Sequence, residues 1–293
     1  MTRGPAHEVA PQELAEIARG LRVLLLRTIH HARSGHTGSA MSCIDILTCL
    51  YFREMHHTPY NAEWPQRDRM VLSKGHASAA LYVALHQAGY VTRAELRQMR
   101  QLESILQGNP DSRRCPGVEA STGSLGQGLS IGHGMALALR GGVDGGEEPR
   151  VYVVLGDGEL QEGQIWEAAM SAGHRGTANL CAIIDANGLQ LDGAVRDIKN
   201  VEPLAAKLEA FGWRALDVSG HDFAALCGAL DAARGERERP TAIIARTVMG
   251  KGVSFMENAI GWHSRAPDAH QLAEALAELD KAKQPAGERA GTR

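Results

Sequence analysis

Two oxygen-bearing side chains follow apolar runs in the middle of the sequence. Asp157 lies between Gly156 and Gly158, and Asn187 follows the next apolar run 30 residues later. Carboxylate and amide oxygens suit Mg²⁺ or Ca²⁺, and glycine lets the backbone approach a bound anion closely. If the two runs are successive parallel strands, their carboxyl ends lie at one edge of a sheet. We therefore expect Asp157 and Asn187 to converge on one divalent cation that holds a diphosphate, with a helix starting near Glu162 facing the anion.

The Gly-Asp-Gly tripeptide is a weak signal when taken alone. Most such tripeptides are ordinary strand-to-helix turns, and an Asp-Ala-Asn run is equally an ordinary cap. The spacing to the asparagine strengthens the ligand interpretation. No GxxxxGK[ST] motif is present, and GSLGQG (123–128) follows no obvious strand. Both observations weaken a nucleotide-binding interpretation.

Three of the 13 histidines lie in motifs of small residues that leave room for a ligand. They are His36 in SGHTG, His76 in SKGHAS and His263 in GWHSRAP. Imidazoles with a pKa near neutrality suit proton transfer. A single histidine in a turn is more often a surface or capping residue, so the other ten are assigned no role.

The pattern of apolar residues predicts the elements that position these groups. Strands are expected at 69–73, 151–157, 180–187, 214–220 and 241–248. Helices are expected at 11–29, 40–52, 74–90, 129–140, 162–174, 201–211, 222–234 and 268–283, with 107–128 as loop. Apolar strands that alternate with helices predict an α/β fold with a parallel sheet covered by helices on both faces. We expect one domain over residues 1–293, with N-terminal helical decoration and flexible tails at 1–11 and 285–293.

Composition excludes several classes of protein. A net charge of -3 with no long run of either sign argues against a nucleic-acid or membrane surface. No segment has the length and apolar character of a signal peptide or membrane span. Five cysteines without a CxxC pair argue against a disulfide framework and favour a reducing cytoplasm.

Several motifs together resemble the transketolase family. GDGELQEG followed by DANGLQLDG is similar to the thiamine diphosphate signature. Four further blocks stand in transketolase order and cover about residues 12–275: SGHTGSAMSCIDIL, RDRMVLSKGHASAALYVAL, PGVEASTGSLGQGLSIGHGMALA and GKGVSFMENAIGWHSRAP. The resemblance implies the diphosphate-binding domain of the thiamine diphosphate-binding fold. The pyrimidine-binding and C-terminal domains of a full transketolase have no counterpart here, so the chain resembles the N-terminal (A) subunit of a split enzyme.

The resemblance also implies the cofactor and the residues that hold it. Thiamine diphosphate would bind with Mg²⁺ or Ca²⁺, held by Asp157, the side chain of Asn187 and the carbonyl of Leu189. Gly156 and Gly158 would line the diphosphate path. The resemblance places three more residues at the cofactor: Gly123 facing the aminopyrimidine, Leu125 beneath the bent cofactor, and Glu162 in a carboxylate network that crosses to the partner. From the sequence alone, Glu162 is as readily a first-turn helix carboxylate.

The three histidines take catalytic roles by the same resemblance. His76 and His263 would also contact the cofactor, and His36 and His263 the sugar substrate. One position departs from the family, which usually has Gly-His-Pro where this chain has Gly108-Asn109-Pro110. Asn109 can form hydrogen bonds with the donor but cannot transfer a proton at neutral pH.

The implied function is transfer of a two-carbon ketol unit from a ketose (phosphate) to an aldose (phosphate). A C-terminal subunit would supply the missing domains and the activating glutamate, in an α₂β₂ assembly. Two alternatives stay open. One is a related thiamine diphosphate ketol or acyl transferase of specialised metabolism, which Asn109 favours. The other is a non-catalytic scaffold that has kept the fold.

Overall fold

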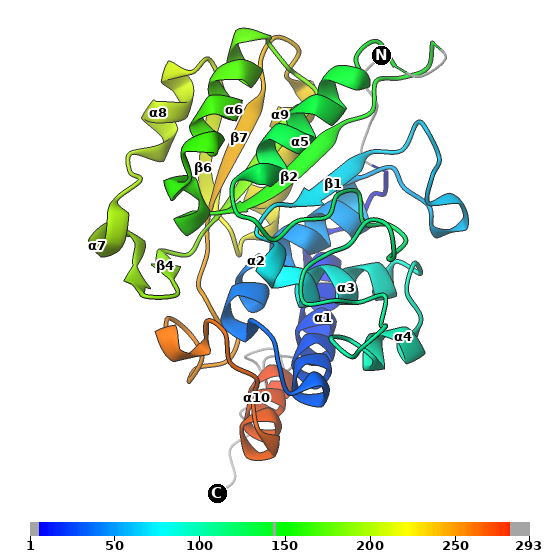
Figure 1. Cartoon of the computed structure of the whole chain (residues 1–293), viewed down its shortest axis with the longest axis vertical. Helices are drawn as coiled ribbons and strands as arrows, with labels where there is room; N and C mark the ends of the chain where they lie inside the picture. The colour runs from blue at the N-terminus through cyan, green and yellow to red at the C-terminus, as the bar shows by residue number, and fades with distance from the viewer. Residues whose placement is uncertain (1–5, 143–144, 282–293) are drawn as a thin grey trace, which may run out of the picture.

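A five-stranded parallel sheet forms the centre of the molecule (Figure 1). The computed structural model describes residues 6–142 and 145–281, so the tail predicted at 285–293 and the first five residues of the tail predicted at 1–11 lie outside the described residues. The strand order is β1-β2-β3-β7-β6. The strands are β1 (Arg69–Leu72), β2 (Val151–Gly156), β3 (Leu180–Ala186), β6 (Arg214–Ser219) and β7 (Thr241–Arg246). All five predicted strands are confirmed, because each apolar run is a buried strand or pairs with one.

Helices cover both faces of the sheet, as predicted. Successive residues of a strand point to opposite faces, so Tyr152 and Val154 pack into one core while Val151, Val153 and Leu155 pack into the other. The first core contains side chains from α1 (Pro11–Ala32), α2 (Thr37–Cys49), α3 (Ser78–Gln87), α9 (Phe223–Gly235) and α10 (Ala269–Lys281). The second contains side chains from α5 (Gln127–Ala138), α6 (Gly163–His174) and α8 (Leu204–Ala210).

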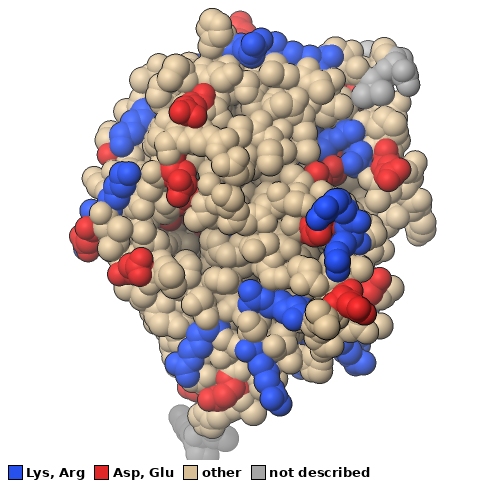
Figure 2. Space-filling model, in the orientation of Figure 1, with Lys and Arg blue, Asp and Glu red and all other residues tan. Residues whose placement is uncertain are grey.

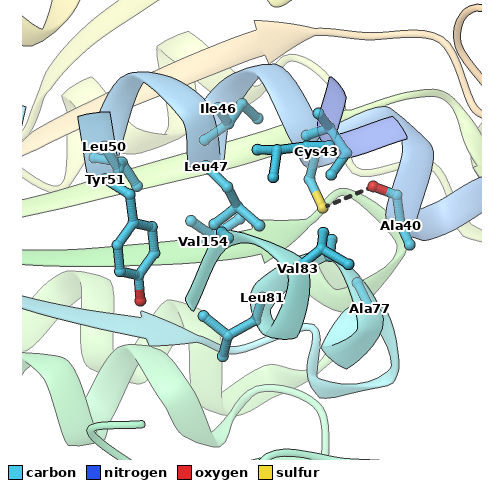
Figure 3. Close-up of a cluster of buried hydrophobic side chains, with 14 of the residues drawn as sticks. Ala40, Cys43, Ile46, Leu47, Leu50, Tyr51, Ala77, Leu81, Val83 and Val154 are labelled. Carbon is cyan, nitrogen blue, oxygen red and sulfur yellow. Dashed lines mark hydrogen bonds between the residues drawn. The ribbon is translucent and has the colours of Figure 1, made fainter. Parts of the chain in front are cut away.

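Helix α2 is buried over its whole length. Figure 3 shows Cys43 and Leu47 of α2 beside Val154 of β2 and beside Leu81 and Val83 of α3. The helix begins three residues before the predicted start, and it continues as a π-helix over Leu50–Glu54. The early start has a tertiary cause: the Thr37 hydroxyl donates a 2.5 Å hydrogen bond to the carbonyl of Arg265. The predicted turn of small residues is therefore helical from Thr37 onward.

Several short elements were not predicted from the sequence. Two are helices, α4 (Arg93–Arg97) and α7 (Val195–Lys199), and two are the paired strands β4 (Leu189–Gln190) and β5 (Gly193–Ala194). A 3₁₀ turn over Gly158–Gln161 also separates β2 from α6. The predicted helix start near Glu162 is correct, since α6 begins at Gly163, but this turn and not α6 follows Asp157 directly.

The N-terminal residues 6 and 7 are joined to the rest of the fold. The backbone N–H of Ala6 donates to the carbonyl of Glu54, and that of His7 to the carbonyl of Arg53. Across residues 6–142 and 145–281, no helix combines the length and apolar character that a bilayer crossing requires.

Candidate functional site

The loops after β2 and β3 meet at the carboxyl edge of the sheet. β2 and β3 are paired in parallel, with Gly156 opposite Asp185. One carboxylate oxygen of Asp157 accepts a hydrogen bond of 2.6 Å from the N–H of Gly188, and the other accepts one of 2.9 Å from the N–H of Gly158. The sequence-based expectation that Asp157 and Asn187 lie on adjacent loops therefore agrees with the geometry.

Asp157 is buried with neutral hydrogen-bond donors around it. Burial raises the pKa of Asp157 to about 6, although the N–H of Gly188 favours the charged form. A nearby cation would favour the charged carboxylate and offset this burial. The amide oxygen of Asn187 accepts from the N–H of Leu189 at 3.0 Å, which folds the three candidate ligands into one tight loop pair. This donor set fits a hard divalent cation.

The glycines that flank Asp157 differ in their surroundings. A Cβ on Gly156 would have its nearest neighbours at 3.9 Å, so the backbone there is open to close approach. A Cβ on Gly158 would lie 3.1 Å from the Cβ of Gln190, so this glycine is packed against β4. The unpredicted hairpin of β4 and β5 thus forms one wall of the site.

The three histidines from distant motifs form one cluster. His36 is the N-cap residue of α2, His76 lies in a 3₁₀ turn after β1, and His263 ends the 3₁₀ turn Ile260–Trp262. The ring centroids lie 5.1 Å (His36–His76), 5.9 Å (His36–His263) and 5.5 Å (His76–His263) apart. Within the described residues, the buried Nδ1 atoms of His36 and His263 have no hydrogen-bond partner. Such atoms are the usual mark of a place where a ligand or water binds.

The histidines are held uncharged at neutral pH. Burial and then the charge of Lys74 lower the pKa of His76 to about 2, and the same two causes lower that of His263 to about 4. Burial, followed by the charges of Arg100 and Lys74, also lowers the pKa of His36. These values lie below the near-neutral range expected from sequence, because the expectation took no account of burial or of the lysine. Uncharged imidazoles can still donate and accept hydrogen bonds.

A buried ion pair lies beneath both groups of residues and was missed in the sequence. The ammonium of Lys74 lies 2.5 Å from a carboxylate oxygen of Asp185, and both side chains are almost fully buried. Burial opposes the charge of Lys74, but Asp185 outweighs it, and the pKa of Lys74 is raised. The hydroxyls of Ser42 and Thr247 also donate to Asp185. The pair therefore joins β1, α2, β3 and the end of β7 at one point.

Helix α2 connects the histidines to the Asp157–Asn187 loops. Ser39 and Ser42 are three residues apart and lie on one face of the helix. The hydroxyl of Ser39 lies 2.8 Å from Nε2 of His76, and the side-chain amide of Asn187 donates to the hydroxyl of Ser42 at 3.3 Å. The only signal in the sequence is the run of small residues after SGHTG.

The loop GSLGQG is fastened by a glutamate that no sequence motif singled out. Buried Glu159 accepts hydrogen bonds from the N–H of Gly126 at 2.9 Å and of Gly156 at 3.0 Å, and from the hydroxyl of Ser73. Gly126 has a φ of +89°, and a Cβ on Gly128 would lie 2.4 Å from that of Ser73. Only glycine allows the first turn of α5 to approach the end of β1 this closely.

The remaining predicted residues surround this loop. Asn109 is exposed, and a Cβ on Gly123 would lie 3.0 Å from its Cγ. Leu125 is half-buried in the same loop. Glu162 is the exposed N-cap residue of α6, and its Cβ would contact one built on Gly126 at 2.9 Å. Its side chain makes no capping hydrogen bond, so the carboxylate is available to other groups.

Comparison with known proteins identifies relatives along most of the chain. Residues 14–284 match the family model described as transketolase, thiamine diphosphate binding domain. The chain is 40% identical to the 6-deoxy-6-sulfo-D-fructose transketolase subunit SqwG of Clostridium sp. (strain MSTE9), over 92% of this chain and 97% of that protein. It is 38% identical to the first of the named subunits of the apulose-4-phosphate transketolase of Phocaeicola vulgatus, over 89% of this chain and 91% of that protein.

Solved structures show the same fold. The transketolase of Campylobacter jejuni superposes with a TM-score of 0.86 at 34% identity, over 94% of this chain and 43% of that one. The transketolase of Leishmania mexicana gives a TM-score of 0.86 at 30% identity, over 94% of this chain and 42% of that one. The present chain thus spans about two fifths of these structures.

Proposed function

The chain belongs to the transketolase family through its thiamine diphosphate-binding domain, and we propose that it is the N-terminal subunit of a two-chain transketolase. The transferred group is a two-carbon ketol unit, moved from a ketose or its phosphate to an aldose or its phosphate. One observation carries the proposal: His36, His76 and His263 form a single cluster that α2 joins to the loops of Asp157 and Asn187. A scaffold would not need this arrangement.

The cofactor proposed for the site is thiamine diphosphate with Mg²⁺. Asp157, the side chain of Asn187 and the carbonyl of Leu189 would hold the cation, and the open backbone at Gly156 would face the diphosphate. Gly123 and Leu125 would contact the rest of the cofactor. When bound, the cofactor supplies a thiazolium carbon that attacks the ketose carbonyl and an electron sink for carbon–carbon cleavage.

The chain's own residues would bind the sugar and hold protons in place. The unpartnered Nδ1 atoms of His36 and His263, within the part of the chain that the structure describes, can form hydrogen bonds with sugar hydroxyls. Ser39 fixes the orientation of His76. Lys74 disfavours protonation of the cluster, so the imidazoles remain able to accept a proton in the reaction. All three histidines are half-buried, so the cluster is partly shielded from water and still open to a ligand.

A partner chain would complete the site. The relatives of similar length are named as subunits, which supports this step. Helix α5 carries no Asp, Glu, Lys or Arg, although Gly134 and Ala138 on it are exposed. Figure 2 shows few charged side chains over the middle of the face on which α5 lies. Depletion of charge is typical of the core of a protein interface.

Apolar side chains near the carboxyl edge support the same interface. Leu191, Ile198 and Ile260 are exposed on the hairpin loop, on α7 and on the turn before His263. Glu162 is also exposed there and would join a carboxylate network with the partner. We infer an α₂β₂ assembly. All five cysteines are free, which supports a reducing cytoplasmic location.

Asn109 favours a specialised sugar donor as a second candidate function. It lies beside Gly123, where the family usually has histidine, and two relatives are named for unusual sugars, sulfofructose and apulose phosphate. A proton can no longer move through this position, so the hydroxyl that it contacts must be recognised by hydrogen bonding alone.

Reconstitution tests the proposal. The chain is purified alone and then mixed with a chain that resembles the pyrimidine-binding and C-terminal domains, and ketol transfer is measured with a panel of ketoses and ketose phosphates. We expect no activity before mixing and activity after it. Activity of the single chain would refute the two-chain proposal, and inactivity of the mixture with every donor would favour the scaffold.

A further inference from the structure

A second cavity lies at the opposite edge of the sheet, beneath the amino ends of the strands. Its volume is about 430 Å³, within the usual range for small-molecule sites. Its walls come from residues that precede or begin β1, β2 and β3, including Asp68, Arg150 and Asn179, and from the ends of α5 and α9, including Arg140 and Arg237. None of these residues belongs to the candidate active site.

Two buried polar side chains in the cavity wall lack a full set of hydrogen bonds. Arg150 is 8% exposed, and its Nη2 donates to the carbonyls of Ala178 at 3.1 Å and Ala233 at 2.8 Å. Asn179 is 3% exposed, and its amide nitrogen donates to the carbonyls of Ala136 and Pro149. Among the residues that the structure describes, Nε of Arg150 and Oδ1 of Asn179 have no partner. Buried groups of this kind are rarely left unsatisfied.

The two carboxylates of the inner wall already have partners. Glu54 is paired with Arg234 and accepts a 2.7 Å hydrogen bond from the hydroxyl of Tyr152. Asp68 accepts hydrogen bonds of 2.8 Å from the backbone N–H groups of Arg150 and His56. Both carboxylates are therefore engaged by groups other than the guanidinium of Arg150.

The arginines at the mouth of the cavity donate to backbone carbonyls. Arg140 donates to the carbonyls of Arg175 and Gly176, and Arg237 to those of Arg234 and Glu236. Glu147 and Glu148 also line the cavity, but they are exposed, where solvent screens their charge. The buried part of the wall therefore offers a cationic donor beside an uncharged acceptor.

We propose that this cavity binds a small hydroxylated organic anion. Its phosphate or carboxylate group accepts a hydrogen bond from Nε of Arg150, and one of its hydroxyls donates to Oδ1 of Asn179. Arginine suits both kinds of anion, because its N–H groups match the spacing of their oxygens. Arg140 and Arg237 attract the anion at the mouth. The site is independent of the partner chain and of the cofactor.

Calorimetric titration of the purified full chain tests the proposal. Glycerol 3-phosphate and glycerate are the probes, since they share hydroxyls and differ in the anionic group, and glycerol is the uncharged control. The wild type is expected to bind at least one anion and not glycerol. Arg150→Gln and Ala178→Leu, which remove the charge and fill the cavity, are each expected to weaken binding by about tenfold or more. Asp157→Asn, at the opposite edge, is the matched control and is expected to leave the affinity unchanged.

Each outcome decides the question. Binding that depends on Arg150 and Ala178 but not on Asp157 supports the proposal, and the stronger probe identifies the anionic group. Absence of binding by both probes overturns it and makes the cavity a water-filled one. Binding that is lost in Asp157→Asn and kept in the other variants places the anion at the cofactor site and also overturns the proposal. If Arg150→Gln does not fold, Ala178→Leu and the exposed variant Arg237→Gln decide in its place.

Discussion

Replacement of Lys74 by methionine tests the buried ion pair beneath the site. Methionine keeps most of the length and apolar volume of the lysine stem but removes the charge. Asp185 would then be a fully buried carboxylate whose remaining side-chain donors, within the described residues, are the hydroxyls of Ser42 and Thr247. Removing one partner of a buried pair costs about 3–5 kcal/mol. Domains are stable by only about 5–15 kcal/mol, so a large share of the free energy of unfolding should be lost.

Urea unfolding of the purified protein measures this loss. Lys199→Met is the matched control, because Lys199 is exposed at the end of α7, and its effect should stay within about 0.5 kcal/mol. The double variant Lys74→Met/Asp185→Asn removes both charges, and the asparagine can still accept from the two hydroxyls. Its stability should lie above that of Lys74→Met, with a coupling of about 1.5 kcal/mol or more between the two sites.

The reasoning fails on either of two results. A loss below about 1 kcal/mol for Lys74→Met would mean that water or a rearrangement compensates Asp185. Additive effects of the two substitutions would mean that the charges do not stabilise each other, whatever the total loss.

Three further predictions concern the site and its supports. Asp157→Ala should abolish Mg²⁺-dependent binding of thiamine diphosphate in the mixed complex, measured by titration calorimetry; unchanged affinity would show that the cation site lies elsewhere. The free energy of unfolding should fall as the pH is lowered from 6.5 to 5.5, because the unfolded chain protonates His76 and His263 near pH 6.5 whereas the fold keeps their pKa at about 2 and about 4. The slope should approach about 1.4 kcal/mol per pH unit for each histidine, and it should be shallower in His76→Asn; an equal slope in that variant would contradict the burial argument. Gly128→Ala should destabilise the protein by about 1–3 kcal/mol, since the added Cβ would meet Ser73 at 2.4 Å, while Gly134→Ala on the same helix has no atom within 4 Å and should be neutral or stabilising, as thermal unfolding would show.

The sheet was predictable because its signals are local. Runs such as Val151–Leu155 are apolar throughout, and strand order places Asp157 and Asn187 together without knowledge of any side-chain contact. The short helix α4 also has a local signal that was overlooked: Thr92 and Glu95 form a capping box, a pattern visible as Thr-x-x-Glu.

The supports of the site were not predictable because their causes are not local. Lys74 and Asp185 are 111 residues apart, and Ser73 and Glu159 are 86 apart. The start of α2 depends on Arg265, and the low pKa of His76 depends on Lys74 and on burial. A buried helix such as α2 also shows no polar face, so its boundary has no amphipathic signal.

The full burial of α2 limits how such an enzyme can acquire new substrates. A change on this helix shifts His76 through Ser39 and Asn187 through Ser42, so sugar recognition and cofactor binding would be altered together. Asn109 stands apart from that helix, on a surface loop that tolerates replacement. Efforts to broaden donor choice should therefore randomise residues 107–113 and keep α2 constant.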